Sequence, residues 1–294
     1  METELDILQL ADYSERFTEG EASAFLIINK NITAHPCMFG FEKLPEDFET
    51  VKKLFEKIES KAKELGYSDI IGPLNHNTWM NYRWATDNYD QILFPDCTNP
   101  PYYVDYIKRL GYDTLYTYRS AMIKIHNPLY EIGAATLGEK KNEGFTFKRY
   151  DGTECLPVLH DLFDITRDAF LGTELYSDIP YEYFEKLYAA KILKIEGLVI
   201  FVAYDQNQKA IGYVLGYPNP DKSIFVAKSS AVMKEYQNNK VYIALLYLGL
   251  KYMEDLGYSE TLFHFQCEQR KTFRRFPAEY ESKEKHYAVF KKEL

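Results

Sequence analysis

The sequence predicts a packed α/β protein that is built from two related halves. Three observations support this prediction. Hydrophobic residues make up 46% and charged residues 27% of the chain, which is the composition of a globular protein. Apolar residues at helical spacing alternate with short apolar runs of strand length. A short sequence repeat, in a chain of 294 residues, is consistent with two domains of ordinary size.

The repeat consists of Glu-Leu-Gly-Tyr-Ser-Asp at residues 64–69 and Asp-Leu-Gly-Tyr-Ser-Glu at residues 255–260. Each copy follows an amphipathic helix, expected over residues 47–65 and 241–256. Gly66 and Gly257 stand where a helix C-terminal cap favours a residue that tolerates positive φ. Each copy precedes an apolar strand, expected over residues 69–71 and 261–265. The repeat therefore indicates a duplicated unit of helix, cap and strand.

We expect an N-terminal domain over residues 1–130 and a C-terminal domain over residues 145–294. Residues 128–144 are rich in Gly, Ala and mixed charges, which is typical of a solvated linker. The expected elements of the second domain are strands at 145–150, 198–204, 210–217, 223–232, 261–265 and 286–291, and helices at 155–170, 181–193, 241–256 and 268–276. The first domain shows only the later part of this order clearly, with a helix near 102–110 and a strand near 114–125.

Charge and composition exclude several classes of function. The net charge of −9 disfavours a nucleic-acid partner. The first residues lack the basic start of a secretory signal, and no apolar run approaches the ~20 residues that span a bilayer. The four cysteines are scattered, so neither a disulfide framework nor a metal site is predicted. We expect a soluble cytoplasmic protein without a membrane partner, and homo-oligomerisation is left open.

The order of elements after Phe145 resembles the GNAT superfamily of acyl-CoA-dependent N-acyltransferases. In the first half, Ile-Gly-Pro-Leu-Asn at 71–75, Asn-Pro-Pro-Tyr-Tyr at 99–103 and Leu-Gly-Tyr at 110–112 resemble bacterial tandem-GNAT proteins. The resemblance implies two tandem GNAT-like domains, each with a mixed, mostly antiparallel, twisted sheet flanked by helices. It also implies that the second half binds the cofactor and that the first half is non-catalytic.

In this family, a loop between a strand and a helix holds the pyrophosphate of coenzyme A with backbone N–H groups. The loop reads Gln or Arg, two residues, Gly, one residue, and then Gly or Ala. Gln237 matches the first position, whereas Lys240 and Tyr242 replace the two small residues. The Tyr242 ring would obstruct the phosphate, and the Lys240 ammonium would neutralise it. The implied cofactor-binding residues are Ala231, Val232, Gln237, Asn238, Asn239, Lys240, Val241 and Tyr242.

The resemblance implies transfer of an acetyl or other acyl group from coenzyme A to a primary amine of a small molecule or peptide. Such a GNAT-type N-acetyltransferase would use acetyl-CoA, or another acyl-CoA, as co-substrate. The reaction needs a base for the ammonium and hydrogen-bond donors for the developing oxyanion. Asp178 and Glu182 lie beside the helix that commonly lines the acceptor site and are the candidate catalytic residues. The backbone of Ala231 and Val232 would hold the thioester oxygen.

Other interpretations stay open. Residues 231–242 also read as an ordinary strand, turn and helix, with Asn238 and Asn239 as turn and cap. The basic run at 269–276 would bind the 3′-phosphate of coenzyme A or would form a solvated helix face. The whole protein could be a degenerate, non-catalytic GNAT-fold protein that binds a ligand or partner, which Lys240 and Tyr242 favour. An aminoacyl transferase that uses charged tRNA is a further alternative, against which the net charge argues.

Overall fold

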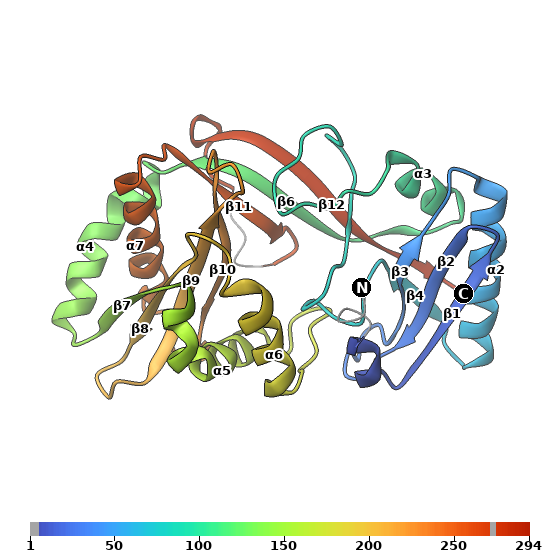
Figure 1. Cartoon of the computed structure of the whole chain (residues 1–294), viewed down its shortest axis with the longest axis horizontal. Coiled ribbons are helices and arrows are strands. Elements are labelled where there is room, and N and C mark those ends of the chain that lie inside the picture. The colour runs from blue at the N-terminus through green and yellow to red at the C-terminus, as the bar shows by residue number, and fades with distance from the viewer. Residues whose placement is uncertain (1–5, 271–274) are drawn as a thin grey trace.

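The computed structural model describes residues 6–270 and 275–294 (Figure 1). The strands are β1 (Tyr13–Glu19), β2 (Ala22–Ile28), β3 (Cys37–Lys43), β4 (Asp69–Gly72), β5 (Trp84–Ala85), β6 (Asp113–Lys124), β7 (Thr146–Asp151), β8 (Val199–Tyr204), β9 (Ala210–Pro218), β10 (Phe225–Val232), β11 (Glu260–Cys267) and β12 (Glu281–Glu293). The α-helices are α2 (Phe48–Glu64), α3 (Pro101–Arg109), α4 (Pro128–Asn142), α5 (Leu159–Phe170), α6 (Tyr181–Leu187) and α7 (Val241–Asp255). Short helical turns are η1 (Asp6–Leu10), η2 (Gly152–Val158), η3 (Tyr188–Ile192), η4 (Lys234–Tyr236) and η5 (Ala278–Tyr280).

The repeated sequence forms the same structural unit twice. In the first half, β3, α2 and β4 follow one another and the two strands are parallel. In the second half, β10, α7 and β11 do the same. Gly66 and Gly257 adopt φ of 85° and 90°, as expected for residues that end the helices. The predicted helices and strands of the repeat are therefore confirmed.

One mixed sheet runs through the described residues, in the order β1-β2-β3-β4-β12-β6-β11-β10-β9-β8-β7. β12, the last strand in sequence, lies between two strands of the first half, β4 and β6. β6 in turn pairs with β11 of the second half. The long β6–β12 pair crosses the molecule in Figure 1, with α4 and α7 at one end and α2 at the other. Each half therefore completes its sheet with a strand from the other half.

Buried charges accompany the strand exchange. Arg119 on β6 is 1% exposed and forms ion pairs with Glu281 and Glu284 at the start of β12. Lys285 on β12 is equally buried, and its Nζ lies 2.9 Å from Asp96 Oδ2. The other Asp96 oxygen accepts a hydrogen bond from the Tyr287 hydroxyl at 2.9 Å. These partners satisfy cations that would otherwise be costly to bury.

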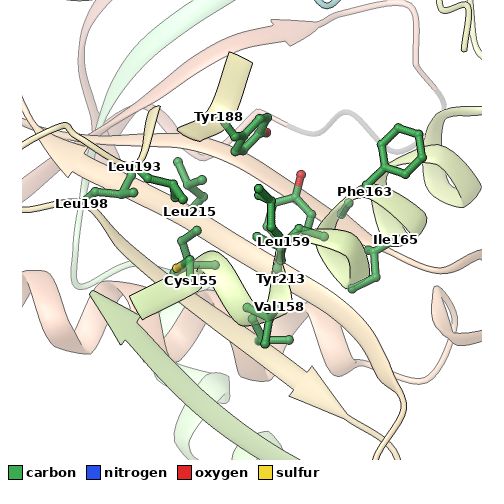
Figure 2. Close-up of a cluster of buried hydrophobic side chains, with 14 of the residues drawn as sticks. Cys155, Val158, Leu159, Phe163, Ile165, Tyr188, Leu193, Leu198, Tyr213 and Leu215 are labelled. Atoms are coloured by element: carbon green, nitrogen blue, oxygen red, sulfur yellow. The ribbon is translucent and has the colours of Figure 1, made fainter. Parts of the chain in front are cut away.

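Helices cover both faces of the second half of the sheet. On one face, apolar residues of η2 and α5 gather with Tyr213 and Leu215 of β9 (Figure 2). Leu159 and Phe163 belong to this cluster, which follows from the apolar spacing of α5. The opposite face is covered by α7, whose Val241, Leu245 and Leu250 are fully buried, and α4 packs against α7.

The prediction of a solvated linker over residues 128–144 is wrong. This segment is helix α4, and the Asn127 side chain caps it by accepting from the Leu129 N–H at 2.9 Å. Gly133 lies against the Tyr247 side chain, where a Cβ would come within 2.5 Å. The small residues that suggested a loop instead allow α4 to pack closely on α7.

The other differences concern the ends of elements. The sequence predicts a helix over 181–193. Its α-helical part ends at Leu187, and a single π-helical turn follows it. The strand expected over 286–291 extends over the whole of β12. No helix covers residues 268–270 or 275–276, and the rest of the helix expected there lies outside the described residues. The remaining helices and strands that the sequence predicts are confirmed to within a few residues.

We predict that Asp96→Asn lowers the free energy of unfolding by about 3–5 kcal/mol, because it leaves the Lys285 ammonium buried without a counter-charge. The double variant Asp96→Asn with Lys285→Met should recover most of this loss. Urea unfolding followed by circular dichroism measures both effects. Glu196→Gln is the matched control, since the Glu196–Lys222 pair is exposed and should leave stability unchanged. An equally small effect of Asp96→Asn would contradict the role given to the buried pair.

Candidate functional site

The strands β10 and β11 diverge and open the sheet of the second half. They pair only from Phe225 with Thr261 to Ala227 with Phe263. Beyond these residues, β10 continues along β9 and β11 continues along β6. Each strand carries an irregularity at the point of divergence, after Ala227 in β10 and after Phe263 in β11. Between them, backbone groups face an opening instead of a neighbouring strand.

A cavity of about 120 Å³ lies at this opening, under helix α7. One face of α7 lines it with Tyr242, Leu246, Gly249 and Met253. Apolar side chains of β8 and β9 also line it. The polar lining residues of β10 and β11 are Lys228, Ser229, Ser230, His264 and Gln266. A mostly apolar cavity with a few convergent polar groups is typical of a ligand site.

The loop from β10 to α7 keeps the backbone shape of a glycine-containing loop. Lys240 adopts φ of 65°, which is the left-handed region that favours glycine. The Val241 N–H bonds to Asn239 Oδ1 at 3.2 Å, and Gln237 Nε2 donates to the Val232 carbonyl at 3.2 Å. Within the described residues, the N–H groups of Asn238, Lys240 and Tyr242 have no partner. The N-terminus of α7 therefore presents unsatisfied donors, as anion-binding helix ends do.

Two side chains of this loop distinguish it from a glycine-rich one. The Lys240 side chain is exposed and its ammonium forms no ion pair within the described residues. The Tyr242 ring is 38% exposed and lines the cavity. Burial raises the pKa of Tyr242 although Ser230 forms a hydrogen bond with its hydroxyl. The ring thus forms part of the cavity wall, and the lysine adds a positive charge to the same loop.

The corresponding helix of the first half lacks these features. Asp47 caps α2, and its carboxylate accepts from the N–H groups of Glu49 and Thr50. Those donors are already satisfied by an anion of the protein itself. Of the two equivalent helices, α7 alone leaves its N-terminus open to a ligand anion.

His264 of β11 lies in the cavity wall, and both of its ring nitrogens form hydrogen bonds with other parts of the protein. Its Nε2 faces the Pro95 carbonyl, which only accepts, so Nε2 carries the proton and donates. Its Nδ1 then accepts from the Ser120 hydroxyl at 2.8 Å. Burial and the nearby Lys228 charge hold the pKa of His264 well below its usual range. The imidazole is therefore neutral and fixes β11 against β6 and the 91–97 segment.

The two candidate carboxylates lie outside the cavity lining. Asp178 forms an ion pair with Arg167 of α5, and the Tyr176 hydroxyl lies 3.4 Å from its other oxygen. Glu182 is exposed in the first turn of α6. Both lie beside α5 and α6, which cover the face of the sheet opposite to α7.

The basic run at 269–276 is described only in part. Arg275 pairs with Glu268 at 2.8 Å, and the Arg270 guanidinium lies 5.1 Å from the Phe170 ring centroid. The rest of the run, residues 271–274, lies outside the described residues, so neither interpretation of it is tested.

The sequence reasoning missed Lys228 and Ser230 as cavity residues. A single lysine in an apolar strand resembles an outward-facing residue at a sheet edge. Only the irregularity after Ala227, which the sequence does not reveal, turns it toward the opening. The signal that was present is the unusual order Lys228, Ser229, Ser230 inside an otherwise apolar strand.

Comparisons with known proteins agree with this geometry. The model of the acetyltransferase (GNAT) family matches residues 159–275, which include the β10–α7 loop. A search of curated proteins finds no match. Among the helices that the structure describes, none combines the length and the apolar character that a bilayer crossing needs.

Solved structures resemble the whole chain in fold. A GCN5-related N-acetyltransferase from Sphaerobacter thermophilus is 13% identical with a TM-score of 0.51, covering 93% of this chain and 76% of that one. A tandem GNAT protein from the clavulanic acid biosynthesis pathway is 9% identical with a TM-score of 0.51, covering 92% and 78%. A GCN5-related glucosamine N-acetyltransferase region of a fungal multi-domain β-N-acetylglucosaminidase is 9% identical with a TM-score of 0.55, covering 99% and 34%.

The mixed sheet, its divergent central strands and these matches lead to one assignment. The chain has the fold of tandem GNAT proteins, and residues 159–275 of its second half match the model of the acetyltransferase (GNAT) family.

Proposed function

We propose that the protein is an N-acyltransferase that moves an acetyl or other acyl group from coenzyme A to a primary amine of a small molecule or peptide. The observation that carries this proposal is the open N-terminus of α7 beside the gap between β10 and β11. An anion bound at the helix end would place the rest of an extended cofactor along the gap. The second half would carry the cofactor, because Asp47 occupies the equivalent donors in the first half.

The residues of the loop fit a pyrophosphate. The N–H groups of Asn238, Lys240 and Tyr242 would donate to it, and the Lys240 ammonium would neutralise part of its charge. The bound acyl-CoA would supply an activated thioester. Ala231 and Val232 pair with β9 along one edge of β10. Because successive N–H groups of a strand point to opposite edges, only one of these two residues would face the gap and donate to the thioester oxygen.

The acceptor would approach from the face that α5 and α6 cover, which is opposite to α7. Asp178 and Glu182 lie on this side and stay the predicted bases for the ammonium of the acceptor. The amine nitrogen would attack the thioester carbon directly, the thiolate of coenzyme A would leave, and the base would take the proton. A reducing cytoplasm that supplies acyl-CoA is the compartment that this reaction needs.

The alternative of a degenerate binding protein rests on Tyr242, whose ring lines the cavity and would obstruct a bound phosphate. The two functions differ in what removal of the ring would do. In an acyltransferase whose loop the ring obstructs, a smaller side chain admits the cofactor more easily. In a protein that has lost the cofactor, the same change has no effect on acyl-CoA.

We predict that acetyl-CoA binds the wild-type protein with micromolar affinity in a calorimetric titration. Gln237→Ala should weaken binding, since it releases the loop from the Val232 carbonyl. Lys240→Met should weaken it about tenfold through the lost phosphate contact, at ~1.4 kcal/mol per factor of ten. Tyr242→Ala should tighten it by removing the obstructing ring.

The control for Lys240→Met is Lys222→Met, which removes an exposed lysine that is paired with Glu196 far from the loop. Lys240→Gly separates the charge from the backbone shape. It should raise stability by about 1 kcal/mol by relieving the left-handed lysine, and it should bind acetyl-CoA as weakly as Lys240→Met. If neither the wild type nor Tyr242→Ala binds acetyl-CoA, the acyltransferase proposal is wrong and the degenerate alternative stands.

We predict that loss of the true base lowers kcat by about 10²-fold or more while acetyl-CoA affinity stays unchanged. Asp178→Asn and Glu182→Gln are the two variants, and release of coenzyme A thiol in the presence of an amine panel is the measurement. Arg167→Met serves as the control for Asp178, because it breaks the same ion pair without removing the carboxylate. Full activity in both carboxylate variants would show that neither Asp178 nor Glu182 is the base.

A further inference from the structure

Two cations that have no counter-ion within the described residues lie near one aromatic ring, that of Phe265, beside the opening between β10 and β11. The first is Arg83, in the segment before β5. Its guanidinium carbon lies 3.7 Å from the ring centroid of Tyr82, 3.8 Å from that of Phe265 and 4.6 Å from that of Tyr118. Its Nε and Nη1 atoms are buried and have no hydrogen-bond partner within the described residues. Aromatic rings surround the arginine, and no carboxylate of the described residues forms an ion pair with it.

The second cation is Lys228, which the irregularity in β10 turns toward the same place. Its Nζ lies 5.3 Å from the Phe265 ring centroid, so Lys228 and Arg83 contact the same ring. The ammonium has no ion pair or hydrogen bond within the described part of the chain. Burial lowers the pKa of Lys228 to about 8, and the nearby Arg83 charge contributes. Lys228 also lines the cavity under α7, so it stands between the two faces of the sheet.

The other groups around these cations do not neutralise them. Lys285 and Asp96 form a closed pair, and both oxygens of Asp96 are already in use. His264 is neutral, since its pKa lies well below the usual range. Burial raises the pKa of the Cys97 thiol to about 11, which leaves it uncharged at neutral pH. The site therefore holds two excess positive charges in a chain whose net charge is −9.

Arg83 and Lys228 are both half-buried, so each charge loses part of its hydration without gaining a counter-charge within the described residues. Unpaired charges that are removed from water lose hydration without a compensating partner. Apolar side chains of similar size would be more stable at both positions. Groups that oppose stability in this way are typical of binding sites, where a ligand supplies the missing charge.

We propose that Arg83 and Lys228 form a subsite for an anionic group, a carboxylate or a phosphate, on the acceptor amine. The planar guanidinium suits two-point recognition of either group, and the ammonium suits a single contact beside it. That the anion belongs to the acceptor rests on the proposed function, which assigns the α7 loop to the cofactor. The anion-binding property itself does not depend on acyl transfer.

Calorimetric titration with two simple probes tests the subsite and distinguishes the two sources of charge. The probes are N-acetylglycine, which carries a carboxylate, and inorganic phosphate; N-acetylglycinamide is the neutral control. We expect at least one anion to bind the wild type and the amide not to bind. Arg83→Met and Lys228→Met should each weaken that binding at least tenfold, whereas Lys222→Met should leave it unchanged.

Binding of N-acetylglycine, whose carboxylate stays ionised throughout this range, should also weaken as the pH rises from 7 to 9. Lys228 is charged below its pKa of about 8 and loses its attraction for an anion above it. Of the neighbouring groups, Cys97 titrates near 11 and His264 well below this range, and the pKa of Tyr118 is raised well above its usual value of 10. The pH dependence should therefore disappear in Lys228→Met.

Stability measurements separate a binding role from a structural one. Lys228→Met should keep or raise the melting temperature, because it removes an unpaired charge. If Arg83→Met fails to fold, Arg83→Lys keeps the charge but loses the two-point geometry, and weaker anion binding with an intact fold supports the subsite. Absence of binding by both anions, or equal binding by Lys228→Met, would overturn the proposal. None of the probes contains coenzyme A. Anion binding without acetyl-CoA binding would therefore contradict the proposed acyltransferase function and leave the anion subsite supported.

Discussion

The pairing of β6 with β12 is the constraint on which the rest of the structure depends. β12 closes the edge of β4 in the first half, and β6 closes the edge of β11 in the second. Neither half has a complete sheet without the strand that the other supplies, and an open edge would expose unpaired backbone groups. The position of one half relative to the other is therefore fixed by the hydrogen bonds of one continuous sheet.

The same constraint creates the opening at the site. β11 is held along β6, and the Ser120 hydroxyl of β6 bonds both His264 and the Phe265 N–H. These bonds keep the irregular part of β11 away from β10, so the two parallel strands cannot close. Lys285 of β12 holds the 91–97 segment through Asp96 and the Gln91 carbonyl, and this segment supplies the carbonyl that orients His264. First-half residues thus shape a cavity whose walls belong to the second half.

Local patterns predicted much of the fold, and pairing between distant strands could not be predicted. The spacing of apolar residues in α2 and α7 and the caps at Gly66 and Gly257 are encoded within one segment each. The exchange of β6 and β12 leaves no trace in either strand, because an apolar strand reads the same whichever neighbour it has. The β10–α7 loop was located through a family pattern. Arg83 and Lys228 were missed because the sequence shows two isolated cations, and only the strand irregularities bring them to one ring.

The two halves use one scaffold with opposite electrostatics at the equivalent helix ends. In α2, the Asp47 carboxylate satisfies the first N–H groups, so the helix end is complete without a ligand. In α7, a lysine holds the left-handed position that glycine would occupy at lower cost, and the donors around it stay unsatisfied. A residue that strains the backbone while adding a positive charge next to open N–H groups is difficult to explain by stability alone. The asymmetry between Asp47 and Lys240 is the physical argument for the proposal that the second half binds an anion and the first half supports it.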